Sequence, residues 1–295
     1  MLECLRGTFG CKDPNQYMQK KLDISFGLKT YNLTFVAYDE NDWNWAHDVR
    51  LKGFETKSIQ FGDCGHFSLI LPKDLTCLII ERNSHWVCLC DALSYNTSSS
   101  LRKIGTYDCQ QLESLFCLSG SCSFCTKIHS LEVLKLERLK SITVLCKEVF
   151  DVRQSLTPFG IFSCLKQFEI VYCHLIEKLF TPRLVQELQN LETIRVEGCN
   201  SMKEIFAAST SDDNDRSIIS LPKLTELNLR YLPQLRTVCK GSISCGSSPK
   251  VYIFNCLNLK RPPTIEIKNE RCWDSQFLVC VFNVCLHFDD ELCTK

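Results

Sequence analysis

The stretch Leu191-Glu-Thr-Ile-Arg-Val-Glu-Gly-Cys-Asn-Ser-Met-Lys-Glu-Ile-Phe206 decides the fold. Its apolar residues fall at offsets 0, 3, 5, 8, 11 and 14 from Leu191. Offsets 3 and 5 have a period of two, so Ile194 and Val196 point the same way from a short strand. The chain must then bend, because the later apolar residues are spaced by three. Such a coil cannot bury its apolar face alone and needs a copy above and below it.

The same offsets recur along most of the chain. Clear copies start at Leu131, Leu165 and Leu224, weaker ones at Leu75 and Leu101, and degenerate ones at Thr30, Thr56 and Ser248. From Thr56 onward, the starting positions lie 19 to 34 residues apart. This is the leucine-rich repeat pattern. It predicts an α/β solenoid, an irregular horseshoe with a short-stranded parallel sheet on its concave face.

The pattern also predicts the domain organisation. Residues 1–29 form a partial repeat and a helical lead-in, because Asp13 and Pro14 together are typical of a helix start. Residues 30–263 form the solenoid, and residues 264–295 form a divergent tail, because the repeat fails after Pro263. Within the solenoid, the clearest helix signal runs from Thr181 to Leu188, with Thr181 as its cap.

The chain contains 21 cysteines, and five of them share one repeat offset, at the turn after each strand: Cys64, Cys109, Cys173, Cys199 and Cys256. A reduced cysteine suits a tight bend as a small apolar residue with a weak S–H donor for nearby carbonyls. The start of the chain lacks a basic region followed by a long apolar run, so it does not resemble a signal peptide. We therefore expect a cytoplasmic location and reduced thiols, with the glycosylation signals at Asn32 and Asn96 unused.

No motif supports catalysis or cofactor binding. The sequence contains no phosphate-binding loop, no nucleophile elbow and no zinc-protease helix. Cys122 and Cys125 form one C-x-x-C pair, which Cys117 and His129 could complete as a metal site. One pair is weak evidence, so we predict ordinary reduced thiols, no metal and no cofactor. The formal net charge of zero gives no reason to expect nucleic-acid binding, and no apolar run is long enough for a membrane span.

The side chains that flank the inward pair of each strand should face outward. They occupy the third, fifth, seventh and eighth positions of each repeat and include Glu81 and Tyr107 near the start of the series. Tyrosine and arginine dominate interface hot spots. We therefore predict a protein-binding face on the concave sheet, formed by Arg138, Glu169, Tyr172, Arg195, Glu197, Arg230, Tyr231, Tyr252 and Phe254.

Two stretches, 191–206 and 221–235, also carry a family resemblance, through the cysteine turn and the Leu-Pro-x-Leu step at Leu221–Leu224. About Leu2 to Pro263 resembles the leucine-rich repeat region of plant intracellular disease-resistance proteins, which have a coiled coil and a nucleotide-binding domain ahead of the repeats. The resemblance implies a role in innate immunity. Its partners would be a pathogen effector, a guarded host protein or the nucleotide-binding domain itself, which the repeats would hold inactive. The present chain contains neither of the two other domains.

The leading hypothesis is thus a non-enzymatic protein–protein interaction module. Three alternatives remain open: a non-functional truncated product of a resistance gene, a substrate-recruiting adaptor of a ubiquitin ligase, and a secreted receptor ectodomain. The adaptor would need a docking helix, which no segment convincingly provides. The ectodomain conflicts with the cysteine series and with the missing signal peptide.

Overall fold

We analysed a computed structural model of the 295-residue chain. It describes residues 4–11, 30–37, 58–61, 74–93, 100–117, 122, 124–125, 128–147, 160–207, 218–267, 277–281 and 284–287. The chain forms two compact units, Met1–Ile161 and Phe162–Lys295, which we call unit 1 and unit 2. The predicted domain boundaries at residues 29 and 263 stay predictions.

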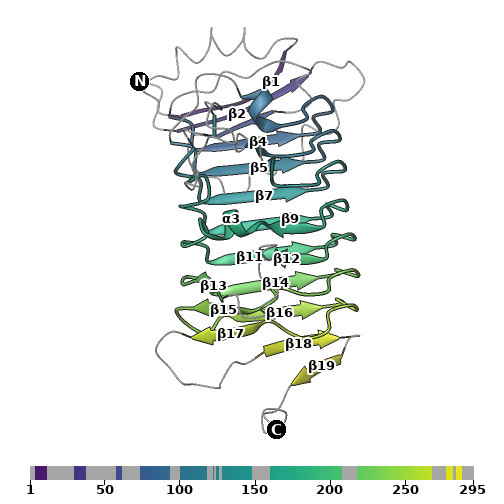
Figure 1. Ribbon diagram of the computed structural model, residues 1–295. Helices are drawn as coiled ribbons and strands as arrows, with labels where there is room; N and C mark the ends of the chain where they lie inside the picture. Colours follow the sequence, from purple (N-terminus) through teal and green to yellow (C-terminus); the bar gives the residue numbers. More distant parts are fainter. Residues whose placement is uncertain are drawn as a thin grey trace, which may run out of the picture. The chain divides into compact units, whose positions relative to one another are not determined.

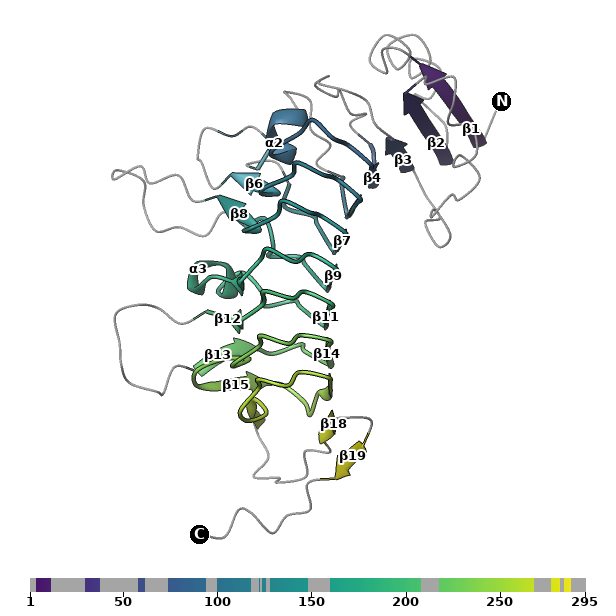
Figure 2. The same ribbon diagram turned by 90° about the vertical axis from the view of Figure 1, so that its right-hand side faces the viewer.

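Unit 1 is built on a sheet of parallel strands, which Figure 1 shows stacked one above another. Its strands pair in chain order. They are β1 (Cys4–Cys11), β2 (Thr30–Ala37), β3 (Ser58–Phe61), β4 (Cys77–Glu81), β5 (Lys103–Tyr107) and β7 (Val133–Glu137). The short strands β6 (Phe116–Cys117) and β8 (Cys146–Lys147) pair with each other. They and the one-turn helix α2 (Leu89–Ala92) lie on the side of the coil away from β4 and β7 (Figure 2).

Unit 2 repeats this plan. Its main sheet contains β9 (Gln167–Val171), β11 (Thr193–Glu197), β14 (Glu226–Arg230), β16 (Lys250–Phe254), β18 (Phe277–Val281) and β19 (Val284–His287). All neighbours are parallel except β18 and β19. The side of the coils opposite the main sheet, which we call the return side, carries two small parallel sheets. One contains β10 (Lys178–Phe180) and β12 (Glu204–Phe206), and the other β13 (Ile218–Leu221), β15 (Ser242–Cys245) and β17 (Thr264–Ile267).

The register confirms the predicted fold class. Val196 lies opposite Ile170 on one neighbouring strand and opposite Leu229 on the other. These three side chains are completely buried, as are the equivalent residues of most described repeats. The chain is therefore a leucine-rich repeat solenoid in which each coil covers the apolar face of the next.

The core of unit 2 lies between the main sheet and the return side. The ring of Phe168, on β9, meets the ring of Phe180, on β10, edge to face at 5.0 Å between centroids. Phe180 stacks in turn on Phe206, on β12, at 5.6 Å. These rings are almost fully buried, so they join the two layers of each coil and also join one coil to the next.

The helix expected from Thr181 to Leu188 is only partly present. Helix α3 covers Pro182–Val185, and Thr181 occupies the cap position without a side-chain hydrogen bond to the helix. Leu184, Val185 and Leu188 are buried as predicted, so packing of the apolar face, not capping, holds this turn. The helix expected at Asp13 lies outside the described residues.

Buried cysteines mark the turns after the strands, as predicted. The Sγ atom of Cys173 lies 3.6 Å from the carbonyl oxygen of Val171, and the Sγ atom of Cys199 lies 3.5 Å from that of Glu197. Cys109 and Cys256 make the same contact with the carbonyl two residues earlier. Asn83 takes this position after β4, where its side-chain oxygen accepts hydrogen bonds from the backbone N–H groups of His85 and Trp86. Cys64 lies outside the described residues.

Candidate functional site

The outer face of unit 2 is the surface formed by the third, fifth, seventh and eighth residues of the repeats on β9, β11, β14 and β16. It holds eight of the nine predicted binding residues, namely Glu169, Tyr172, Arg195, Glu197, Arg230, Tyr231, Tyr252 and Phe254; Arg138 belongs to unit 1. None of the nine is buried. The strand register places their side chains side by side because residues at one repeat position are direct partners across the sheet.

Arg195 organises the charge on this face. Its guanidinium donates to the carboxylate of Glu169 on the neighbouring strand at 2.9 Å, and to that of Glu197 on its own strand at 2.8 Å. One cation thus bridges two anions across β9 and β11. Arg195 is still about half exposed, with 48% of its side-chain surface accessible, so the network can contact a partner.

The next strand, β14, also carries a hydrogen-bonded polar pair. Arg230 donates from Nε to the side-chain oxygen of Asn228 at 2.8 Å. Asn228 lies directly opposite Arg195 and Tyr252 on the flanking strands. Lys250 and Glu226 complete a face on which both signs of charge alternate. Such a surface favours a partner that also presents both signs of charge, and it gives no attraction for a uniformly charged polymer.

From the repeat that starts at Leu75 onward, the eighth position of each described repeat has a left-handed backbone. The φ angles lie between 52° and 64° at Arg82, Asp108, Arg138, Tyr172, Gly198, Tyr231 and Asn255. Except at Arg138 and Asn255, the structure gives the backbone N–H of each of these residues a hydrogen bond to the carbonyl of the seventh residue of the next repeat. The turn therefore extends the hydrogen-bond ladder of the sheet by one residue beyond the strand. This holds the side chain of the eighth residue at the strand end. Because most of these residues are not glycine, sequence reasoning did not find this strained position.

Aromatic side chains occupy several of these strand ends. Tyr231 is 44% exposed, and its ring packs edge to face on Phe254 of the next repeat at 5.2 Å. Tyr172 is 45% exposed and covers Gly198, where a side chain would collide with its ring. Both tyrosines are thus held by neighbours while much of each ring remains available to a partner.

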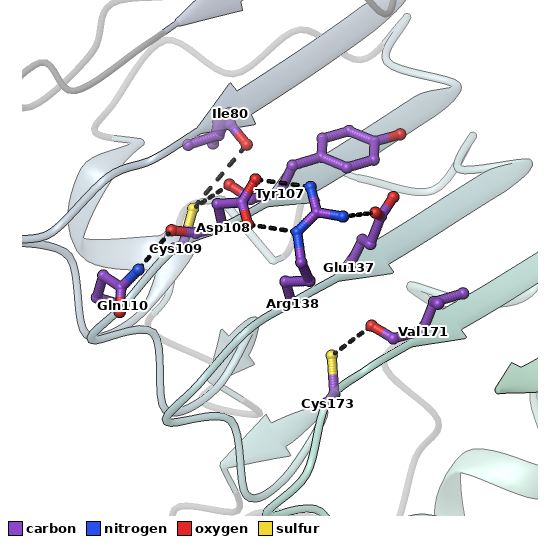
Figure 3. A network of polar contacts seen from close by, with 9 residues as sticks. All are labelled: Ile80, Tyr107, Asp108, Cys109, Gln110, Glu137, Arg138, Val171 and Cys173. Atoms are coloured by element: carbon purple, nitrogen blue, oxygen red, sulfur yellow. Dashed lines mark hydrogen bonds and ion pairs between the residues drawn. The ribbon is translucent and has the colours of Figure 1, made fainter. Parts of the chain in front are cut away.

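The predicted residue Arg138 lies on unit 1, where it forms a second strand-end network (Figure 3). Its guanidinium binds both carboxylate oxygens of Asp108, at 2.5 and 2.8 Å, and also contacts Glu137. The hydrogen bonds that Arg138 donates to the Asp108 carboxylate are the main reason why the pKa of Arg138 rises above its ordinary value. Asp108 and Arg138 are equivalent residues of successive repeats, so this ion pair repeats the coil-to-coil linkage seen on unit 2.

Two residues expected on the outer face of unit 1 are not surface residues. Glu81 and Tyr107 are each only 7% exposed. Tyr107 forms a small buried cluster with Cys77 and Ile79, and its ring lies over Gly105. The apolar residues at outward positions of β4 make this part of the face a packing surface. Glu81 and Tyr107 thus occupy outward repeat positions, but neighbouring side chains cover them, so the exposed surface that we expected at these two residues is not present.

The structure also brings together four thiols that sequence reasoning had treated as ordinary. Cys90, Cys117, Cys122 and Cys125 have their Sγ atoms within 4.8 Å of one another. Burial tends to raise the pKa of the Cys122 thiol, but hydrogen bonds from Cys125 and neighbouring thiols outweigh it and lower that pKa. His129, which the sequence suggested as a ligand, is not part of the group, and Cys90 was missed because it lies 27 residues before Cys117.

The stacked coils, the buried leucine positions and the turn cysteines define a leucine-rich repeat protein. The repeats are of a particular kind: residues 135–262 match the family described as "Plant disease resistance protein RPS2-like, leucine-rich repeats". The resemblance to the repeat region of plant resistance proteins is thus confirmed.

A curated Arabidopsis thaliana protein, "Probable disease resistance protein At4g27220", is 29% identical over 116 residues. The match covers 37% of this chain and 13% of that protein's length. No solved structure matches the chain significantly. Within the part of the chain that the structure describes, no helix is long and apolar enough to cross a membrane.

Proposed function

We propose that the chain is a non-enzymatic protein-binding module of plant innate immunity, and that it binds its partner through the outer face of unit 2. The observation that carries this proposal is the side-by-side placement of half-exposed Tyr172, Tyr231 and Arg195 on adjoining repeats, each held by a neighbour. The repeats of disease-resistance type in residues 135–262 support the same role.

The arrangement suits binding for an energetic reason. A tyrosine presents a large contact area with few rotatable bonds, so little conformational entropy is lost when a partner immobilises it. Phe254 supports Tyr231, and the two carboxylates that flank Arg195 fix its guanidinium plane before binding. Preorganisation of this kind lowers the free-energy cost of association.

The partner we propose is a protein: a pathogen effector, a guarded host protein or a nucleotide-binding domain that the repeats hold inactive. A cytoplasmic location agrees with such partners and with the reduced turn cysteines. The mixed charge on the outer face supports a protein over nucleic acid. The chemistry that we find on this face is recognition chemistry, so we propose no catalytic step.

The test compares two variants that remove similar side chains from opposite sides of unit 2. Arg230→Ala/Tyr231→Ala removes a cation and a large apolar group from the outer face. Lys178→Ala/Ile218→Ala removes the same kinds of group from β10 and β13 on the return side. Binding to a separately expressed nucleotide-binding domain of a coiled-coil resistance protein, and to a panel of candidate effectors, is measured by calorimetry.

We expect the outer-face variant to bind about tenfold or more weakly, since hot-spot residues contribute about 2 kcal/mol or more. The return-side variant should bind within about twofold of the wild type. Both should unfold at wild-type urea concentrations, because all four side chains are at the surface. Unchanged affinity in the outer-face variant, or an equal loss in both, would contradict the assignment of the face.

A further inference from the structure

The four thiols of Cys90, Cys117, Cys122 and Cys125 come from three separate segments of unit 1. Cys90 lies in α2, Cys117 ends β6, and Cys122 and Cys125 lie in the segment that follows β6. The sulfur atoms of Cys90 and Cys125 are separated by 3.3 Å, and all pairs in the group lie within 4.8 Å. A repeat solenoid needs no such convergence for its core, since the buried leucines already supply that.

The spacing matches a tetrahedral metal site. Four sulfurs at about 2.3 Å from one Zn²⁺ ion lie about 3.8 Å from each other. The 3.3 Å distance between Cys90 and Cys125 and the upper limit of 4.8 Å for the whole group lie on either side of that value. A disulfide needs a sulfur separation of about 2.05 Å, and all four thiols are reduced. Four soft sulfur ligands in one compact group favour zinc or a single iron ion.

Backbone donors already point at two of the sulfurs. The N–H of Cys117 donates to Sγ of Cys90 at 3.3 Å, and the N–H of Cys125 donates to Sγ of Cys122 at 3.4 Å. Hydrogen bonds of this kind stabilise thiolates and orient them toward a metal. The second one lies within the C-x-x-C pair and links the Cys122 sulfur to the backbone of Cys125.

The segment that carries the C-x-x-C pair is anchored to the coil. Phe124 is 1% exposed and its ring stacks on that of Phe116, with centroids 6.2 Å apart. Phe116 belongs to β6, which pairs with β8. Cys125 is buried, while the other three thiols are partly exposed, so an ion has access from solvent.

From this geometry we infer that Cys90, Cys117, Cys122 and Cys125 bind one Zn²⁺ ion as a structural tetrathiolate site. Binding releases the four thiol protons and leaves four thiolate ligands around the ion. With no ligand position open, the ion does no chemistry on a substrate. It joins α2 to the strand and turn of the following coil, on the side of unit 1 away from β4 and β7 (Figure 2). The site is thus separate from the proposed binding face on unit 2.

The experiment measures metal in the full chain, purified with a reductant and without chelators. We expect about one Zn²⁺ per chain by elemental analysis, since one ion takes four thiolates. Cys122→Ser/Cys125→Ser should lose about tenfold or more of this metal. Cys109→Ser is the matched control: this thiol is buried in the same unit and donates to the carbonyl of Tyr107, but it is not in the group, so zinc should stay at the wild-type level.

A second measurement needs no variant. Zinc-loaded wild-type chain is alkylated under native conditions and mapped by mass spectrometry, and the same is done after removal of the metal with a chelator. After chelation, Cys90, Cys117, Cys122 and Cys125 should all become alkylated together. In a separate sample, cobalt added in place of zinc should give the absorption spectrum of a tetrahedral cobalt thiolate. The proposal is overturned if reduced chain takes up no zinc, if Cys90 and Cys125 are joined as a disulfide, or if the metal found is iron.

Discussion

The ring of Tyr172 lies against Gly198, which occupies the same repeat position on the next strand: a methyl carbon added to Gly198 would be 2.4 Å from Cδ1 of Tyr172. Both residues have a positive φ angle at the end of their strands. The glycine at position 198 thus leaves room for the Tyr172 ring. Its backbone conformation alone does not require glycine, since other residue types adopt it in the neighbouring repeats.

Replacing Gly198 with alanine should push the Tyr172 ring out of place. We expect a loss of about 1 to 3 kcal/mol in the free energy of unfolding, because the new methyl group combines left-handed strain with a steric clash. Urea denaturation of Gly198→Ala, Tyr172→Ala and the double variant measures the coupling between the two positions. The double variant should be more stable than the sum of the single losses predicts. Simple additivity would mean that the ring does not depend on the glycine.

A buried leucine at an inward position and an exposed leucine in a turn should respond differently to the same substitution. Leu229 is completely buried between two strands, whereas Leu257 is 51% exposed. Leu229→Ala should lower the free energy of unfolding by about 2 to 5 kcal/mol, since it leaves a cavity in the core. Leu257→Ala should change it by less than about 0.5 kcal/mol. Similar losses in the two variants, measured by urea denaturation, would contradict the assignment of inward positions.

Substitution of Arg195 can show whether this residue of the outer face contributes to binding or to stability. Although it links Glu169 and Glu197, exposed ion pairs contribute only about 1 kcal/mol or less. Arg195→Ala should therefore leave the urea midpoint nearly unchanged and weaken binding to the partner found for the wild type. A variant that loses stability but binds as well as the wild type would show that Arg195 serves the fold.

The inward positions could be predicted from the sequence because one offset rule applies to every coil. Ile170, Val196 and Leu229 lie on neighbouring strands as that rule requires. The left-handed eighth position could not be predicted in this way. Arginine, aspartate, tyrosine, glycine and asparagine all occur there, so the backbone conformation is imposed by the coil and leaves no residue signature.

The proximity of the four cysteines also could not be predicted from the sequence. Their proximity depends on the path of the return segments, and the spacing between repeat starts varies too much to place Cys90 beside Cys125. The burial of Glu81 and Tyr107 was missed for a related reason. The offset rule assigns a direction to each side chain on a strand, but it says nothing about whether the outward side of that strand is covered.

The turn cysteines predict how stability depends on pH. Burial, the largest cause, raises the pKa of the Cys199 thiol to about 12, so the folded chain keeps this proton well above neutral pH. The unfolded chain releases it near pH 8.5. The folded state therefore has the raised pKa, and the contribution of this thiol is complete below about pH 8.5 and decreases as the pH rises toward 12.

Cys199→Ala removes this dependence at one turn. At pH 7 the variant should be less stable than the wild type by about 1 to 2 kcal/mol, because a buried sulfur is lost. Between pH 8.5 and 10, however, the wild type should lose stability faster, by at most about 1.4 kcal/mol per pH unit for this one thiol. The gap between their urea midpoints should therefore narrow as the pH rises. A gap that stays constant from pH 7 to 10 would mean that Cys199 does not remain protonated in the folded chain while it ionises in the unfolded one.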